Sequence, residues 1–307
     1  MAIKISVINF KGGVGKTTLS FHLATYLANL GKKVLVVDVD HQSSLSIVML
    51  GDKLWEETIK NRQTCNTIFE SFCNAEVSMP DQDIIFKNPL HAHHRHSNLY
   101  PTLDLVPAQF ELDDTEIELA ATTSGNPFRS EWQKRTLLAK WLDSVNADND
   151  YDFILFDCPP ATKFVSQNAL AASNYFLIPV IPDVMSSRGV THFKHLVTQK
   201  IDDKLESLRI GANISEANVP KSYVPKTKMA AIVPSMARSN INLHTEQLYA
   251  LRQKWGNDML ENVIELRIGV SEATASGWPV WNFSTQNIDA AKPMFKKVCD
   301  EIYLRII

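Results

Sequence analysis

The chain has 307 residues, of which 45% are hydrophobic and 21% are charged, and its formal net charge is −3. This composition is typical of a globular protein with a sizeable core, and the charge disfavours a protein that binds nucleic acid over its whole surface. No apolar stretch approaches the ~20 residues of a membrane span, the N-terminus lacks signal-peptide anatomy, and the four cysteines have no paired spacing. We therefore expect a cytoplasmic protein without disulfides, a zinc site or an iron–sulfur cluster.

The first predicted element is a strand over residues 3–10, followed by a glycine-rich turn and a helix with leucines at helical spacing over residues 19–30. The turn reads Lys11-Gly12-Gly13-Val14-Gly15-Lys16-Thr17-Thr18. In such a setting, backbone N–H groups and a helix N-terminus surround a phosphate chain, and glycines let the backbone approach it. Lys16 can neutralise the outer phosphates, and the Thr17 hydroxyl can ligate Mg²⁺. The turn departs from the standard phosphate-loop pattern, because Phe10 replaces its first glycine and Lys11 adds a second lysine.

Strands and helices alternate along the rest of the chain. Further strands are expected at residues 32–40, 103–107, 153–156, 175–181, 229–233 and 263–266, and helices at residues 110–121, 132–145, 190–208, 242–255 and 290–303. This order predicts the α/β class, with a doubly wound, mostly parallel sheet flanked by helices on both faces. Because no linker or repeat is evident, we expect one domain over residues 1–307.

Residues 50–101 are the least regular part of the sequence. They contain a predicted helix around residues 67–73 and the histidine-rich segment His91-Ala92-His93-His94-Arg95-His96. Dense histidines can bind a metal ion, but no Cys, Asp or Glu ligand lies beside them. We therefore favour an exposed loop at residues 91–96 over a metal site.

Carboxylates close two of the predicted strands. Asp157 follows an apolar strand and precedes Pro159-Pro160, and Asp38 and Asp40 end the second strand. Ligands of open α/β sheets bind beyond the carboxyl ends of the strands, so these carboxylates are candidates for the Mg²⁺ shell and the attacking water of a nucleotide hydrolase. The competing interpretation is that they only form turns.

The lysine-containing loop and the run Phe156-Asp157-Cys158-Pro159-Pro160 resemble the ParA/MinD family of deviant Walker A ATPases, and similar segments continue nearly to the C-terminus. The resemblance implies ATP and Mg²⁺ as cofactors, with residues 11–18 as the phosphate loop and Asp157 bound to the metal through water in the family's manner. It also implies an ATP-dependent homodimer in which Lys11 reaches the partner's nucleotide, and it assigns catalytic roles to Lys11, Lys16 and Asp38, the last by positioning or activating the water. His41 stands where the family usually has proline.

Within the family, features that are missing favour the ParA type. Paired cysteines for a cluster are absent, an added membrane-binding helix is not evident, and the first strand starts at residue 3, so we expect any DNA binding to come from the ATPase domain itself and not from an N-terminal DNA-reading domain. The resemblance therefore implies a nucleoid-associated ATPase that binds DNA without sequence preference, works with a ParB-like or adaptor protein, and partitions plasmid or chromosome DNA or positions a large protein cargo. A MinD-like ATPase on a membrane surface is the alternative, although we expect no membrane contact, and a metabolic P-loop enzyme comes third.

Residues 219–254 contain six basic residues and one acid, Glu246. Such a stretch is often only a solvated face, but it can also attract phosphates. Lys226, Lys228 and Arg238 are our candidates for DNA contacts, because we expect them to flank a strand end near the nucleotide.

Overall fold

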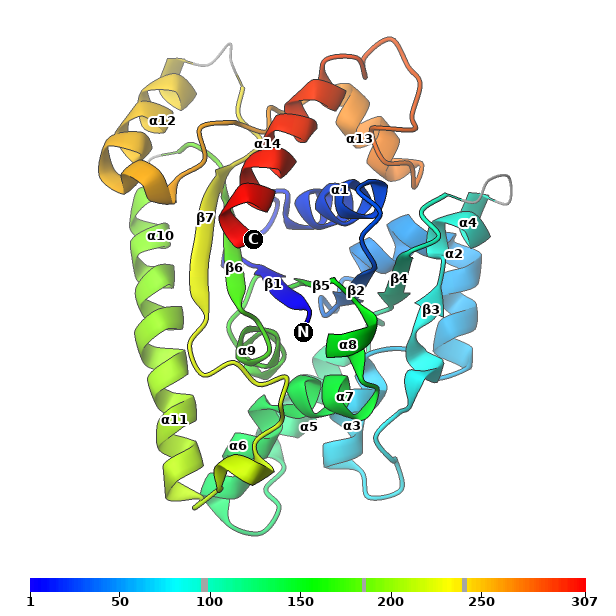
Figure 1. The fold of residues 1–307 in the computed structure, drawn as a ribbon, viewed down its shortest axis with the longest axis vertical. Coiled ribbons are helices and arrows are strands. Elements are labelled where there is room, and N and C mark those ends of the chain that lie inside the picture. The colour runs from blue at the N-terminus through cyan, green and yellow to red at the C-terminus, as the bar shows by residue number, and fades with distance from the viewer. Residues whose placement is uncertain (95–98, 184–185, 239–241) are drawn as a thin grey trace.

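The computed structural model describes residues 1–94, 99–183, 186–238 and 242–307, without the side chains of residues 186–188 and 242. Seven strands form one sheet in the order β3-β4-β2-β5-β1-β6-β7 (Figure 1). β3 runs antiparallel to β4, and all other neighbours in the sheet are parallel. The strands are β1 (Ile3–Val7), β2 (Val34–Asp38), β3 (Phe86–Lys87), β4 (Leu103–Val106), β5 (Phe153–Asp157), β6 (Tyr175–Val180) and β7 (Lys228–Pro234).

Helices cover both faces of the sheet, so that the central strands β2 and β5 are buried along their whole length (Figure 1). One layer holds α1, α2, α13 and α14, and its core includes Leu23 and Phe295. The other holds α3, α5, α7, α9 and α10, and its core includes Phe69 and Leu138. The helix bounds are α1 (Lys16–Asn29), α2 (Ser44–Lys60), α3 (Asn66–Cys73), α4 (Pro89–His94), α5 (Leu112–Ala121), α6 (Pro127–Arg135), α7 (Leu137–Ser144), α8 (Ala147–Asp150), α9 (Phe164–Ala171), α10 (Ser186–His195), α11 (Asp202–Gly211), α12 (Asn242–Trp255), α13 (Ile268–Ala275) and α14 (Ala291–Ile306). The predicted fold class is confirmed.

Three predicted elements differ from the structure. Residues 263–266 form no strand; Glu265 makes an isolated bridge to Ala237, because this segment runs beside the loop after β7 instead of along β7. The helix expected at residues 132–145 is interrupted at Thr136, whose φ of −122° is not helical, and α6 begins earlier, where the Asn126 side chain accepts a hydrogen bond from the Arg129 N–H at 3.1 Å. The helix expected at residues 190–208 is longer, since a π-helical segment at residues 196–201 joins α10 to α11.

The prediction of an exposed loop at residues 91–96 is wrong for residues 91–94, which are the part of this segment that the structure describes. Residues 91–94 belong to α4, and the rings of His93 and His94 are stacked 4.4 Å apart and half-buried. His94 also stacks on Trp278 at 3.7 Å and donates from Nε2 to the Gly277 carbonyl at 2.9 Å. His93 and His94 therefore serve as packing groups against a distant loop, whereas His91 is exposed; residues 95 and 96 lie outside the described residues.

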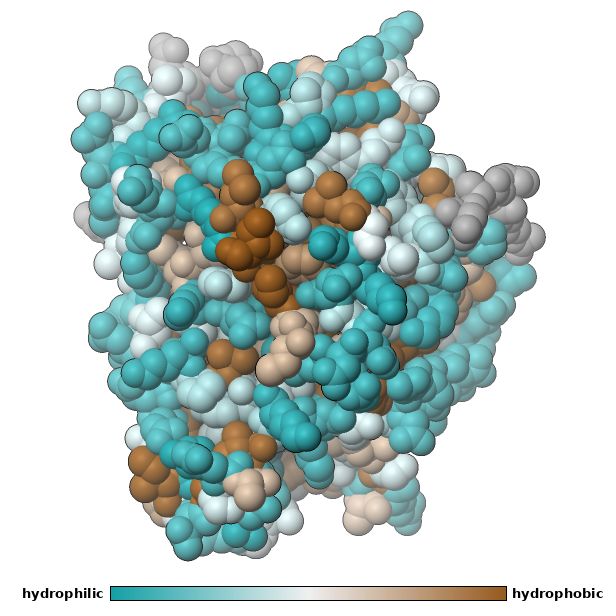
Figure 2. Space-filling view, viewed as in Figure 1, coloured by the Kyte–Doolittle hydropathy of each residue, from teal (hydrophilic) through white to brown (hydrophobic). Residues whose placement is uncertain are grey.

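The surface is largely hydrophilic, with hydrophobic patches over the C-terminal end of α14 and over the region where α6 meets α11 (Figure 2). Within the described ranges, no helix has both the length and the apolar character that crossing a bilayer requires.

Candidate nucleotide-binding site

The predicted phosphate loop connects β1 to α1 at the carboxyl edge of the sheet. Gly13 and Gly15 have φ values of 70° and 81°, in the left-handed region that other residues rarely adopt. A Cβ atom built on Gly12 or Gly13 would meet nothing within 4 Å, so this side of the loop faces open space. Among the described residues, no side chain caps α1, which leaves its first N–H groups available to an anion. The Lys16 side chain is buried in this setting.

Asp157 lies at the end of β5 and is held by the first turn and a half of α1. The hydroxyl of Thr17 donates to its Oδ2 at 2.8 Å, and that of Ser20 donates to its Oδ1 at 2.8 Å. Burial raises the pKa of Asp157 to about 6, although both hydrogen bonds act to lower it. A cation beside this carboxylate would offset the burial, and a hydroxyl with a carboxylate is a donor set that suits Mg²⁺. Thr17 and Asp157 therefore fit the metal site that the sequence predicts.

Asp38 ends β2 directly beside Asp157, since the two are paired residues of neighbouring strands. Ser46, in α2, donates to its Oδ2 from the backbone N–H at 2.9 Å and from the hydroxyl at 2.6 Å, and the Asp40 N–H donates to its Oδ1 at 3.1 Å. Burial and the charge of Asp157 raise the pKa of Asp38 well above its usual range. The site thus holds a carboxyl group that is fixed in position and that binds a proton more tightly than an exposed carboxyl group does. Sequence analysis missed Ser46, whose role depends on the fold of α2.

Lys11 points away from the two carboxylates. Its ammonium group forms an ion pair with Asp183, which follows β6, and half of its side chain is exposed. Lys11 therefore lies at the outer edge of the loop, whereas Lys16 lies inside it.

A cavity of about 290 Å³ opens beside the loop next to Gly15. Met236 forms one wall, with its Cγ 3.7 Å from the Cβ position of Gly15, and the segment from Ile264 to Ala275 forms the other. Ser235, after β7, donates to the Val14 carbonyl at 2.7 Å and ties this wall to the loop. An apolar cavity at the end of a phosphate site can hold a nucleoside base. Sequence analysis missed these residues, because the segment that begins at Ile264 reaches the loop only through its contacts with the end of β7 in the fold.

His22 connects the loop to the C-terminal part of the chain. Its Nδ1 lies 2.7 Å from the Thr18 carbonyl, and its Nε2 accepts a hydrogen bond from the Val280 N–H at 3.2 Å, so Nδ1 carries the proton. The ring stacks on Phe295 at 4.2 Å, and burial lowers its pKa to about 4. The ring is therefore a neutral structural link.

The three candidate DNA contacts do not form one surface near the nucleotide, and the expectation that all three flank this edge is wrong. Lys226 and Lys228 lie at the amino end of β7, and Arg238 follows its carboxyl end. Because β7 runs parallel to β6, its seven residues separate the two ends by about 20 Å. Only Arg238, which is exposed, lies at the nucleotide edge.

A glycine-rich loop around a buried lysine, next to carboxylates at two neighbouring strand ends, defines a P-loop nucleotide-binding protein. A protein-family profile described as an AAA domain matches residues 2–210. The chain is 27% identical to the chromosome partitioning protein ParA of Caulobacter vibrioides, over 90% of this chain and 85% of the relative. It is 26% identical to the sporulation initiation inhibitor protein Soj of Bacillus subtilis, over 90% of this chain and 89% of the relative.

Solved structures share the fold. Apo McdA from Cyanothece has a TM-score of 0.66 at 15% identity, over 100% of both chains. A plasmid partition protein from Borrelia burgdorferi has a TM-score of 0.59 at 20% identity, also over 100% of both chains. The chain belongs to the ParA/MinD family of P-loop ATPases.

Proposed function

We propose that this protein is an ATP-driven dimerising switch of the ParA type, which hydrolyses ATP and binds DNA without sequence preference. The observation that carries the proposal is the placement of Asp38 and Asp157 side by side at the mouth of the phosphate loop. Hydrolysis requires a carboxylate near the metal and a group that prepares water, and two adjacent carboxyl groups with different partners can divide these tasks.

The residues of the site would act as follows. The N–H groups of residues 11–18 and the Lys16 ammonium would hold the phosphates, and Thr17 with Asp157 would hold Mg²⁺, Asp157 through a water molecule. The metal ion, when bound, supplies positive charge to the phosphates. Asp38, fixed by Ser46, would orient the attacking water and accept its proton, which a raised pKa favours.

ATP would bring two copies together, with Lys11 leaving Asp183 to reach the partner's phosphates. The dimer would bind nucleoid DNA in the cytoplasm, and a ParB-like or adaptor protein would stimulate hydrolysis and release. The relatives named as partition proteins support this cycle, with plasmid or chromosome DNA or a protein assembly as the cargo. Exposed Arg238 at the nucleotide edge supports a DNA contact near the dimer face.

Calorimetry with Mg·ATP tests nucleotide binding, and the release of phosphate from Mg·ATP tests hydrolysis. Lys16→Ala should lose measurable ATP affinity, because the charge within the loop is removed. Lys33→Ala, at an exposed lysine before β2, is the matched control and should behave as wild type. ATP affinity that survives in Lys16→Ala would show that the loop does not bind phosphate as proposed.

Co-sedimentation distinguishes DNA from a membrane as the partner to which the ATP-bound protein binds. With ATP, the wild type should sediment with plasmid DNA and not with anionic liposomes. Binding to liposomes alone would replace the DNA-based proposal with a membrane-surface ATPase.

A further inference from the structure

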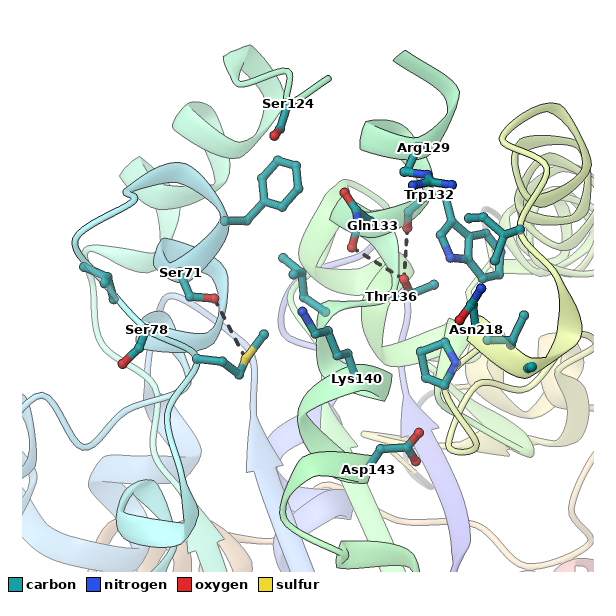
Figure 3. A pocket seen from close by; sticks show the side chains of 18 residues that line it. Ser71, Ser78, Ser124, Arg129, Trp132, Gln133, Thr136, Lys140, Asp143 and Asn218 are labelled. Carbon is teal, nitrogen blue, oxygen red and sulfur yellow. Dashed lines mark hydrogen bonds between the residues drawn. The ribbon is translucent and has the colours of Figure 1, made fainter. Parts of the chain in front are cut away.

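A large groove lies far along the chain from the phosphate loop, on the outer surface of α6 and α7. Its volume is about 890 Å³. One wall is the end of α3 with the turn after it, and the other is the loop of residues 214–220, with the α6–α7 side chains between them (Figure 3). We call it the α6–α7 groove. None of the residues assigned above to nucleotide, metal or DNA lines it.

The groove combines polar, apolar and basic lining residues. Trp132 and Leu137 are 2% and 4% exposed and lie beneath its floor, so the apolar side chains that a ligand can reach are the partly buried Phe72, Met79 and Val219 of its walls. A hydrophobic patch lies over the region where α6 meets α11 (Figure 2); Phe128, which precedes Arg129 in α6, is 53% exposed, and Ile210 in α11 is 64% exposed. A ligand with only polar groups would leave this lining in contact with water.

The charges that line the groove are unbalanced. Arg129 and Lys140 are exposed, and neither side chain forms an ion pair within the described part of the chain. Asp143 is the lining carboxylate, and both its oxygens are occupied: Oδ2 accepts from the Lys221 N–H, and Oδ1 accepts from the Ser222 N–H at 2.8 Å and the Ser222 hydroxyl at 2.7 Å. Figure 3 shows Lys140 between the walls, with Asp143 at one end and Arg129 at the other. The two cations are therefore available to an incoming anion.

We propose that the α6–α7 groove binds an acidic peptide segment of a partner protein, with apolar side chains against Phe72, Met79 and Val219 and carboxylates on Arg129 and Lys140. Eleven positions along α6 and α7 would separate the two cations by about 16 Å in one straight helix, and the interruption at Thr136 makes this distance an upper bound. An extended peptide spans this distance in about five residues. The segment should thus carry two acids about five positions apart, with apolar residues between them. Two isolated cations between partly apolar walls suit a peptide better than a nucleic acid, whose closely spaced phosphates need a continuous basic track.

The proposal is tested with the full chain and a phage-displayed library of random peptides of about ten residues. Selection on the wild type should enrich Asp and Glu flanking apolar residues. In fluorescence polarisation, a selected peptide should bind the wild type about tenfold more tightly than its glutamine counterpart, and added salt should reduce the difference. The double variant Arg129→Glu/Lys140→Glu should lose this preference and bind a lysine counterpart instead. Lys297→Glu, at an exposed lysine of α14, is the matched control and should bind as wild type does.

Three results would overturn the proposal: selected peptides without acidic enrichment, equal binding of the acidic and glutamine peptides, or acidic-peptide binding that survives the double charge reversal. Loss of binding to a DNA duplex in the double variant, with peptide binding unchanged, would assign the groove to nucleic acid instead. All measurements are made without nucleotide and repeated with Lys16→Ala. The result is therefore independent of whether the proposed ATPase cycle is correct.

Discussion

Replacing Asp157 by asparagine is expected to stabilise the ligand-free protein while removing its metal site. Burial raises the pKa of Asp157 from its ordinary 3.8 to about 6. A difference of this size means that the ionised side chain disfavours folding by about 3 kcal/mol at neutral pH. Asparagine occupies the same volume without the charge, but it accepts the hydroxyls of Thr17 and Ser20 less well, which costs about 1 kcal/mol. The net gain of about 2 kcal/mol corresponds to a rise in Tm of about 3 °C.

The pH dependence of this gain has a definite sign. Because the folded protein binds the Asp157 proton more tightly than the unfolded chain does, its stability falls as the pH rises from about 4 to about 6. Above pH 6 the penalty is complete, and near pH 4 it is almost absent. The stability difference between Asp157→Asn and the wild type should therefore appear between these values.

Thermal unfolding at pH 4 and pH 7.5, without nucleotide and metal, measures both quantities. Asp148→Asn is the control, because it makes the same chemical change where the carboxylate is paired. Lys4, which is fully buried, donates to both Asp148 oxygens at 2.8 and 2.9 Å. Removing one partner of such a pair costs about 3 kcal/mol or more, so this variant should be less stable. A lower Tm for Asp157→Asn at pH 7.5, or an equal gain at both pH values, would refute the assigned burial effect.

The other predictions concern the proposed cycle. Asp38→Ala should bind ATP and accumulate as a long-lived dimer in size-exclusion chromatography, because water is no longer prepared; rapid turnover in this variant would remove its assigned role. Lys11→Ala should bind nucleotide but hydrolyse it slowly, and wild-type turnover would argue against a contribution in trans. Neutralising Arg238 should weaken ATP-dependent binding to all DNA sequences equally. It should also make the slope of log affinity against log salt concentration less steep, by about 0.9 for each phosphate contact that is lost. The same change at Lys226 and Lys228 should have a smaller effect, because they lie at the other end of β7; DNA affinity unchanged in all three would place the contact elsewhere.

Sequence patterns predicted most of what depends on neighbours in the chain. Continuous apolar runs marked β2 and β5 because helices bury both faces of these strands. The phosphate loop was recognisable because its glycines and lysines are consecutive, and Asp38 and Asp157 could be placed because parallel strands end at the same edge.

The features that were missed depend on distant partners. α2 continues through Gly51, whose φ of 70° and ψ of 160° break the helical pattern, so no single period marks it. His93 and His94 pack against a loop almost two hundred residues later, which their polar sequence does not reveal. Likewise, Lys226 and Lys228 are close to Arg238 in sequence, but a strand places them at opposite edges of the sheet.

The support of the phosphate loop extends past residue 210, where the match to the family profile ends. Ser235 donates to the Val14 carbonyl, and the Val280 N–H donates to the His22 ring. A fragment that ends at residue 210 would therefore lack both contacts. Because Val280 contributes a backbone N–H, its side chain can change without loss of this contact, whereas Ser235 contributes its hydroxyl. Substitutions are therefore expected to be tolerated better at Val280 than at Ser235.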